Sequence, residues 1–270
     1  MDHRNQKVTA IREIIDNSIK SFVDGFESRY ENDVLLDSGV INQKKNNIFI
    51  RELGEEFMFY SAFVRSFDSS FGGLLERIGN SIAKLSYEVR FGIDSFILPQ
   101  QEQHIRFLIG HYKDKNKPLV SDYSTFTCPQ PKNIESYKQK HNTDNYFYDD
   151  ETKSHYLIEL KAGGDLDNKK AESEKNALLT EYFLLKNSLI GTNDNLEIKF
   201  ATAYNKFGEG NQWKQFSVKT FFSDDELLIG KDYWNFVCKD EKGFEIVFEQ
   251  YKDSSKYLKD ALERIKALYF

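Results

Sequence analysis

The stretch that decides the fold covers residues 141–164, HNTDNYFYDDETKSHYLIELKAGG. Its second half is apolar and ends in Glu159-Leu160-Lys161, just before two glycines. Because alternate residues of a β-strand share a face, Glu159 and Lys161 point to one side of this strand, and Ile158 and Leu160 point to the other. We therefore expect one charged face and one face that packs into the core.

A second acidic residue, Asp144, stands fifteen positions before Glu159. Residues 145–148 and 155–161 are separated by a polar run of hairpin length, which predicts two antiparallel strands. Asp144 would then place a second carboxylate on the strand beside Glu159. Hard oxygen ligands of this kind suit Mg²⁺, so the hairpin predicts a magnesium site.

The segments after the hairpin predict the rest of the core. Gly163 and Gly164 end the second strand, residues 170–190 carry the apolar spacing of a long helix, and residues 196–204 alternate as a strand. A strand, helix, strand order implies a right-handed crossover with parallel pairing. The core is therefore expected to be a mixed sheet flanked by helices.

Elsewhere the chain is mostly helical by pattern. Apolar residues at spacings of three and four predict helices over residues 8–26, 55–67, 74–89 and 254–268. The segment Ser69–Gly73 is interpreted as a break between the second and third of these. All four prolines lie between residues 94 and 140, so only short regular structure is expected there. The pattern leaves residues 227–237 unassigned.

The domain organisation predicted from these patterns is simple. No linker, repeat or low-complexity tract divides the 270 residues, which favours a single α/β domain with helical additions. Within it we expect a helical N-terminal part over residues 1–95, a catalytic core over residues 140–205 and a C-terminal part over residues 206–270.

Composition limits the class of protein. A hydrophobic content of 40% suffices for a buried core, and no apolar run is long enough to span a membrane. The start, residues 1–7, lacks the apolar segment of a signal peptide, so a cytoplasmic protein is expected. Cys128 and Cys238 are too few and too far apart for a disulfide scaffold or a metal pair, and both are expected to be buried.

The net charge of −6 argues against a nucleic-acid partner, because DNA binding rewards surface Lys and Arg. A total charge hides local patches, however, and metal-binding carboxylates are neutralised when a cation is bound. Two basic groups are candidates for phosphate contact. Lys169 and Lys170 begin the predicted crossover helix, and Lys113, Lys115 and Lys117 form a polar run; simple solvation is the alternative for both groups.

Several other polar residues have two interpretations. Glu76, expected in the first turn of the helix over residues 74–89, either complements the helix dipole or supplies a third carboxylate to the metal. Asp165 and Asp167 either add a second metal position or cap the following helix. His141 and His155 lack a partner at zinc-ligand spacing and are expected to be structural. Trp213 and Trp234 are expected to be core anchors.

The arrangement Asp144, fourteen residues, then Glu159-Leu160-Lys161 fits the Asp…(Asp/Glu)-X-Lys pattern, so the chain resembles the PD-(D/E)XK nucleases. The short motif alone is common by chance, but here it ends an apolar strand, is followed by two glycines and precedes a crossover helix. Thr143 replaces the proline of the named pattern, which shapes only the backbone. Together with Thr143-Asp144, further segments resemble a type II restriction endonuclease of the TdeIII kind: residues 59–72, 156–165 with 168–171, 204–209 and 228–236.

This resemblance implies a function. In such enzymes the counterparts of Asp144, Glu159 and the backbone carbonyl of Leu160 bind Mg²⁺, and the counterpart of Lys161 holds the attacking water and offsets negative charge. The resemblance also implies Glu76 as a further ligand. The implied activity is sequence-specific cleavage of double-stranded DNA to 5′-phosphates, with GGNCC as the implied site. A homodimer and a cognate DNA methyltransferase are the implied partners.

Two alternatives remain open from the sequence. One is a repair or recombination nuclease with the same restriction-endonuclease-like core, which would recognise DNA structure instead of sequence. The other is a non-catalytic DNA-binding or partner-binding protein, in which Glu159 and Lys161 are only a same-face ion pair on a solvated strand.

Overall fold

The computed structural model describes residues 3–129, 137–163 and 166–270, without the side chains of Leu35 and Asp144. The chain divides into two compact units. The helical unit joins Met1–Ile82 to Lys242–Phe270, and the sheet unit is the continuous segment Ala83–Glu241. No linker pattern marks this division, because the helical unit is assembled from two segments far apart in sequence. A single nuclease domain over residues 1–270 stays a prediction.

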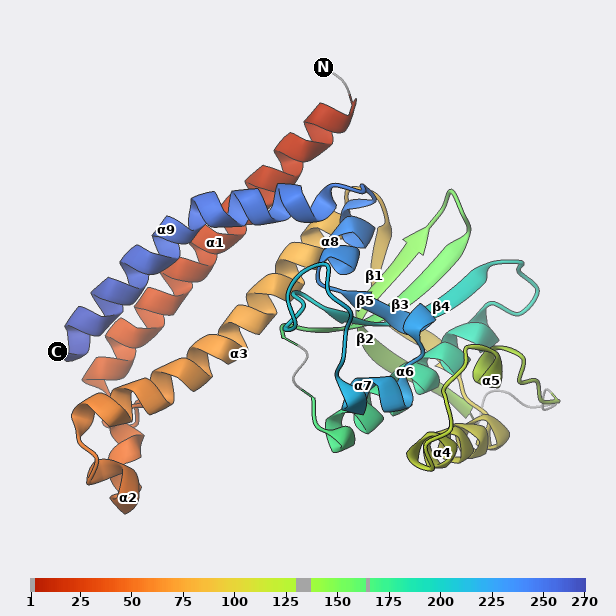
Figure 1. The fold of residues 1–270 in the computed structure, drawn as a ribbon, viewed down its shortest axis with the longest axis horizontal. Coiled ribbons are helices and arrows are strands. Elements are labelled where there is room, and N and C mark those ends of the chain that lie inside the picture. Colours follow the sequence, from red (N-terminus) through yellow and green to blue (C-terminus); the bar gives the residue numbers. More distant parts are fainter. Residues whose placement is uncertain (1–2, 130–136, 164–165) are drawn as a thin grey trace. The chain divides into compact units, whose positions relative to one another are not determined.

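The helical unit is built on three long helices, α1 (His3–Leu35), α3 (Glu55–Ala83) and α9 (Gly243–Tyr269) (Figure 1). The short helices η1 (Asn42–Asn46) and α2 (Ile48–Arg51) connect α1 to α3. Contacts between α1 and α9 follow the same order on both helices: Asp16 with Ser254, Glu27 with Arg264, and Tyr30 with Tyr269. The first and last long helices are therefore parallel neighbours.

Aromatic rings hold α3 against α1. Phe22, Phe26 and Tyr30 on α1 meet Phe63 and Phe67 on α3, with ring centroids 5.3 to 6.3 Å apart. The order is reversed between the two helices, so α3 runs antiparallel to α1. Aromatic pairs at these separations stabilise the packing beyond simple burial.

The break expected at Ser69–Gly73 is wrong, because α3 is one continuous helix of 29 residues. Its apolar spacing continues through the glycines, from Phe67 and Phe71 to Leu74, so packing offsets the low helix propensity of glycine. Glu76 therefore lies inside a helix and not in a first turn, which removes the dipole explanation for it. The helix ends at Ala83, and Val89, predicted to be helical, belongs to a strand.

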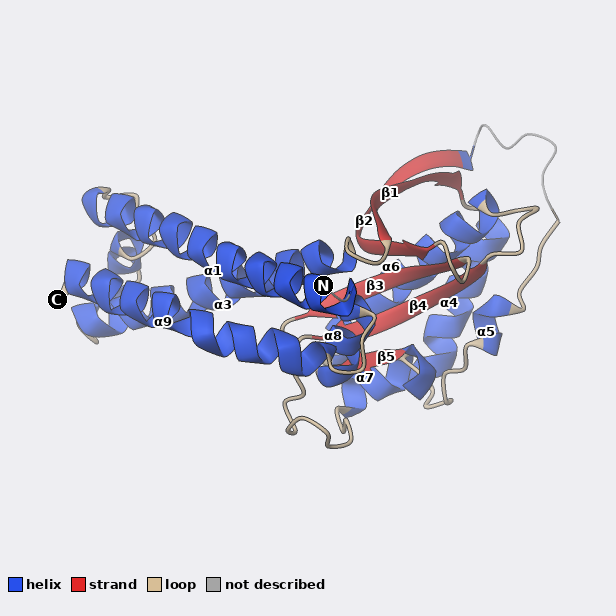
Figure 2. Ribbon diagram, turned by 90° about the horizontal axis from the view of Figure 1, so that it is seen from above, coloured by secondary structure: helices blue, strands red, loops and turns tan. Residues whose placement is uncertain are grey.

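The sheet unit contains a five-stranded sheet in the order β1-β2-β3-β4-β5 (Figure 2). Its strands are β1 (Glu88–Phe96), β2 (Lys138–Asp149), β3 (Ser154–Lys161), β4 (Asn195–Thr202) and β5 (Leu227–Ile229). The first three are antiparallel, and β3, β4 and β5 are parallel. The predicted hairpin, the crossover helix α6 (Asn168–Ser188) and the parallel return strand are confirmed, and with them a mixed α/β sheet flanked by helices.

Helices cover both faces of the sheet. On one face Tyr146, Leu157 and Ile198 join a core with residues of α4 (Pro99–Lys113), α6 and α7 (Phe216–Phe221). On the other face Phe236 of α8 (Lys231–Cys238) contacts the rings of Tyr87 and Tyr156. The short helices α5 (Ser121–Ser124) and η3 (Asp224–Glu226) complete the described elements of this unit.

Helix α4 contradicts the expectation that residues 94–140 contain only short regular structure. It is 15 residues long and begins at Pro99. Proline is favourable at a helix start, since its missing N–H would have no partner there. The Gln101 side chain accepts a hydrogen bond from the Leu98 backbone N–H, which secures the same end.

The core of the sheet unit contains a buried ion pair between Lys175 of α6 and Glu226 of η3, whose side chains are 0% and 1% exposed. Glu226 also accepts hydrogen bonds from the Tyr123 hydroxyl (2.9 Å) and from the backbone N–H of Ser223 (2.7 Å). Burial lowers the pKa of Lys175, and the charge of Glu226 opposes that shift. Each charge therefore depends on the other for compensation.

Several single-residue expectations can be compared with this core. Trp213 and Trp234 are buried, which confirms them as core residues, and the Trp234 indole donates to the Ala203 carbonyl. Cys238 is buried as expected, whereas Cys128 is only partly buried. Among the described residues, no helix combines the length and apolar character needed to cross a membrane.

Candidate active site

Glu159 and Lys161 lie at the end of β3, on the face that carries Leu157. Their partners on β4 are Phe200 and Thr202. The expectation of one charged and one core face is therefore wrong in part, because Leu157 on the charged side is fully buried. The strand packs against α6. On the face that carries Leu157, the side chains change from apolar to charged only in the last residues of the strand.

Two carboxylates hold the Lys161 ammonium. Its Nζ atom lies 2.5 Å from Oε1 of Glu159 and 2.9 Å from Oε1 of Glu174. The three side chains are 31%, 17% and 21% exposed, respectively, so they are open enough to meet a ligand. Burial alone lowers the pKa of Lys161, but the charge of Glu159 and the hydrogen bonds to both carboxylates outweigh it and raise the pKa. Lys161 is therefore a cation at neutral pH.

Glu174 was missed by the sequence analysis. It comes from α6, thirteen residues beyond Lys161, and no short motif joins the two. The available signal was its position: Ala171, Glu174 and Leu178 follow a spacing of three and four, and Ala171 and Leu178 are buried. An acid within the buried stripe of a helix needs a polar partner, and Lys161 is that partner.

The three other predicted metal ligands, Asp144, Leu160 and Glu76, are described by the structure to different extents. Asp144 belongs to β2, but its side chain is outside the described part. Leu160 lies between Glu159 and Lys161 on β3, and its carbonyl as a ligand stays a prediction. Glu76 lies in α3 of the helical unit, and its role as a ligand likewise stays a prediction.

The polar residues around the strand are mostly structural. Asp167 caps α6, since its Oδ1 accepts the Lys170 backbone N–H at 2.8 Å, which confirms the cap interpretation; Asp165 lies outside the described residues. His155 is buried between the Tyr146 hydroxyl (2.7 Å) and Asp194 (3.0 Å). His141 contacts Glu181 at 3.1 Å. Both histidines thus have protein partners.

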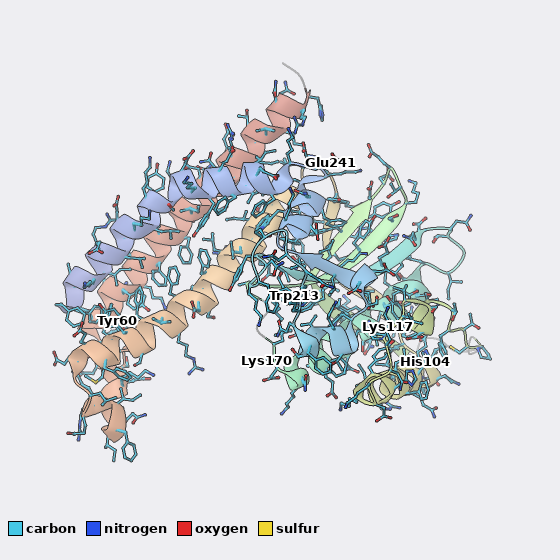
Figure 3. The ribbon with its side chains drawn as sticks, viewed as in Figure 1. Tyr60, His104, Lys117, Lys170, Trp213 and Glu241 are labelled. Carbon is cyan, nitrogen blue, oxygen red and sulfur yellow. The ribbon has the colours of Figure 1, made fainter. Side chains whose placement is uncertain are left out.

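Basic residues gather at the start of α6. Lys169 and Lys170 are exposed there, and Figure 3 labels Lys170 on this first turn. A hollow of about 730 Å³ between α4 and α6 is lined by Arg106, Lys113 and Lys169, among others. Lys113 pairs with Glu172 at 2.6 Å, so it is not merely solvated. This end of α6 therefore combines a cationic surface with the carboxylate that holds Lys161.

A second Glu-X-Lys pair provides an internal comparison. On β4, Lys199 lies 2.8 Å from Glu197, the same spacing as in Glu159-Leu160-Lys161. Lys199, however, donates its other hydrogen bond to the Asp225 backbone carbonyl at 2.7 Å. Lys161 alone of these two lysines has carboxylates from two separate elements. The pair on β4 is therefore a natural control for the pair on β3.

Packing explains why a glycine stands at position 163, two residues after Lys161. A Cβ atom at Gly163 would collide with the Tyr204 hydroxyl, just beyond the end of β4. Tyr204 is half exposed, so its ring covers the strand end without being fixed in the core. The residue at position 163 must be small for the phenol to lie there.

The donor set at this strand end fits a divalent cation. Glu159 supplies carboxylate oxygens, the ligand type that Mg²⁺ prefers, while Glu174 contacts the Lys161 ammonium. Beside Lys161 on β4, the buried Thr202 hydroxyl has no hydrogen-bond partner in the described residues. In the same part of the chain, which leaves out the Asp144 side chain, no three His, Cys, Asp or Glu residues form a metal-binding group. A complete site here thus requires a further ligand.

Comparison with known families defines the class. A family model described as a type II restriction endonuclease matches residues 5–255, nearly the whole chain. The chain belongs to the HinfI family of type II restriction endonucleases. This supports the class expected from the sequence, but not the TdeIII kind in particular. No curated protein and no solved structure matches the chain.

Proposed function

We propose that this chain is a Mg²⁺-dependent type II restriction endonuclease whose reactive centre is formed by Lys161, Glu159 and Asp144. The observation that carries the proposal is the partly exposed Lys161 ammonium, held by two carboxylates at the end of a central strand. Membership of a restriction endonuclease family supports DNA hydrolysis as the reaction. The restriction-endonuclease-like core is part of the same proposal, and the mixed sheet is consistent with it.

The strand register supports Asp144 as the second acid. The last pair between β2 and β3 joins Tyr146 to Leu157. Two residues further along each strand are position 144 on β2 and Glu159 on β3. Asp144 is therefore the acid of β2 nearest to the end of this pairing, two residues beyond the last pair as Glu159 is on β3, which favours Asp144 over more distant acids.

The chemistry assigned to the chain follows from charge. Asp144, Glu159 and the Leu160 carbonyl would hold Mg²⁺, which when bound supplies polarisation of the scissile phosphate. The Lys161 ammonium donates hydrogen bonds to a phosphoryl oxygen and to the attacking water, and it offsets the negative charge that grows during the reaction. Water adds to phosphorus as the P–O3′ bond breaks, which leaves a 5′-phosphate and a 3′-hydroxyl.

The test is cleavage of a defined plasmid with Mg²⁺ and with EDTA. We expect discrete fragments with Mg²⁺ and no cleavage with EDTA, because carboxylates alone cannot neutralise the phosphate. End sequencing of the fragments gives the recognition sequence. One candidate is GGNCC, the site implied by the resemblance to the TdeIII kind. A smear, or cutting only at junctions, would favour the structure-specific nuclease, and intact plasmid under all conditions would contradict the proposal.

The same proposal includes partners. A homodimer, with one active site for each strand, would match the two-fold symmetry of a palindromic DNA site. A cognate DNA methyltransferase would protect the host from the enzyme. Glu76 as an additional metal ligand also belongs to the proposal, and a Glu76→Gln variant that keeps wild-type Mg²⁺ dependence would remove it.

Lys169 and Lys170 are expected to contact DNA phosphates. Changing both to alanine should flatten the plot of log affinity against log salt by about two, since each phosphate contact contributes roughly one to the slope. Binding would be measured with Ca²⁺ in place of Mg²⁺, so that the DNA stays intact. The control is Lys153→Ala, which removes an exposed lysine paired with Asp150 at the β2–β3 turn. Equal slopes for all three proteins would refute the phosphate contacts.

A further inference from the structure

Of the two carboxylates that contact Lys161 in the described part of the chain, Glu174 is the one that does not share its strand. The ammonium lies between Glu159, two residues earlier on β3, and Glu174, which projects from α6. The two carboxylates thus reach one nitrogen from different layers of the sheet unit. A change at one of them need not displace the other.

The helix that carries Glu174 is firmly held. Asp167 caps its first turn, Ala171 is fully buried, and Lys175, the next residue after Glu174, forms the buried pair with Glu226. Glu174 is therefore mounted on a rigid backbone, whereas its own side chain is partly exposed. A side chain can hold another side chain in a fixed position only if its own backbone is rigid.

The two carboxylates are not equivalent in the proposed reaction. Glu159 is assigned to the cation, and a bound cation both competes for that carboxylate and repels the ammonium beside it. Lys161 would then lose part of its attraction to Glu159 at the moment when it must stay near the phosphate. Among the described residues, Glu174 is then the other negative charge in contact with the ammonium.

We propose that Glu174 is a positioning residue, which keeps the Lys161 ammonium at the scissile phosphate while Glu159 is engaged by the cation. This inference rests on the proposed nuclease function. It assigns no metal ligation to Glu174. The neutral isostere Gln keeps the shape of the side chain but removes the charge that anchors the ammonium.

The test compares Glu174→Gln with Glu159→Gln and with Glu172→Gln. Glu172 is the matched control, because it also lies on α6 and also pairs with a lysine, Lys113. We expect kcat of Glu174→Gln to fall by about tenfold to a hundredfold, with unchanged KM and unchanged Mg²⁺ midpoint. Glu174→Asp should recover part of the loss, and Glu172→Gln should resemble the wild type.

A second measurement uses no catalysis. Calorimetric titration of the free protein with Mn²⁺ should give wild-type affinity for Glu174→Gln and weakened binding for Glu159→Gln. Weakened Mn²⁺ binding in Glu174→Gln would make Glu174 a metal ligand and overturn its assignment as a positioning residue. So would a kcat equal to that of Glu172→Gln, or a lowered melting temperature without rescue by Asp. A wild-type chain that leaves DNA intact would refute the nuclease proposal itself, and Glu174 with it.

Discussion

Lys161→Met is expected to lower the rate of DNA cleavage by at least about a hundredfold, while DNA affinity measured with Ca²⁺ changes little. Methionine keeps much of the side-chain volume but removes the ammonium that Glu159 and Glu174 hold. The loss belongs to the transition state, where negative charge grows on the phosphoryl oxygens. Single-turnover cleavage of a short duplex with excess enzyme measures it directly.

The matched control for this prediction is Lys199→Met. Lys199 belongs to the other Glu-X-Lys pair, on β4, and its second partner is a backbone carbonyl instead of a carboxylate. Near-wild-type cleavage by this variant would show that a lysine beside a glutamate on a strand is not enough. Full activity of Lys161→Met, or equal losses in both variants, would end the assignment of Lys161.

Glu226→Gln is expected to destabilise the sheet unit by about 3–5 kcal/mol, because it leaves the Lys175 charge buried without an opposite charge. The side chains of this pair are almost completely inaccessible, so water cannot compensate. Urea unfolding followed by tryptophan fluorescence reports on this unit alone, since both tryptophans of the chain, Trp213 and Trp234, lie within residues 83–241.

Two further variants separate the buried pair from ordinary ion pairs. Lys175→Met combined with Glu226→Gln should recover much of the lost stability, because no unpaired charge remains. Glu172→Gln, which breaks the more exposed pair with Lys113, should cost at most about 1 kcal/mol. If Glu226→Gln unfolds at the wild-type urea concentration, the buried pair has no such role.

The part of the fold that follows local patterns could be predicted. The hairpin of β2 and β3, the crossover helix α6 and the parallel strand β4 each have a strong period and a clear end, and all are confirmed. Glu159 and Lys161 were also expected on one face, because strand alternation is a property of the backbone. These features depend on neighbours in sequence.

The features that could not be predicted from the sequence depend on contacts between residues far apart in the chain. Proline at position 99 suggested a break, but its place at the first turn makes it the start of α4. Two glycines suggested a break in α3, but aromatic rings of α1 pack against Phe63 and Phe67, just before the glycines, and the helix continues. Glu174 could not be associated with Lys161, because only the packing of α6 over β3 brings them together. Tertiary packing decided each case against local propensity.

The parallel pairing of α1 and α9 also affects the order of events during synthesis. The sheet unit is one continuous segment, and all of it is synthesised before α9. Helix α1 can pack against α3 early, but the part of its surface that contacts α9 is covered only after α9 has been made, and such long-delayed contacts favour transient misassembly. We therefore expect chains that end at residue 241, once released from the ribosome, to bury the sheet core while α1 remains sensitive to proteases.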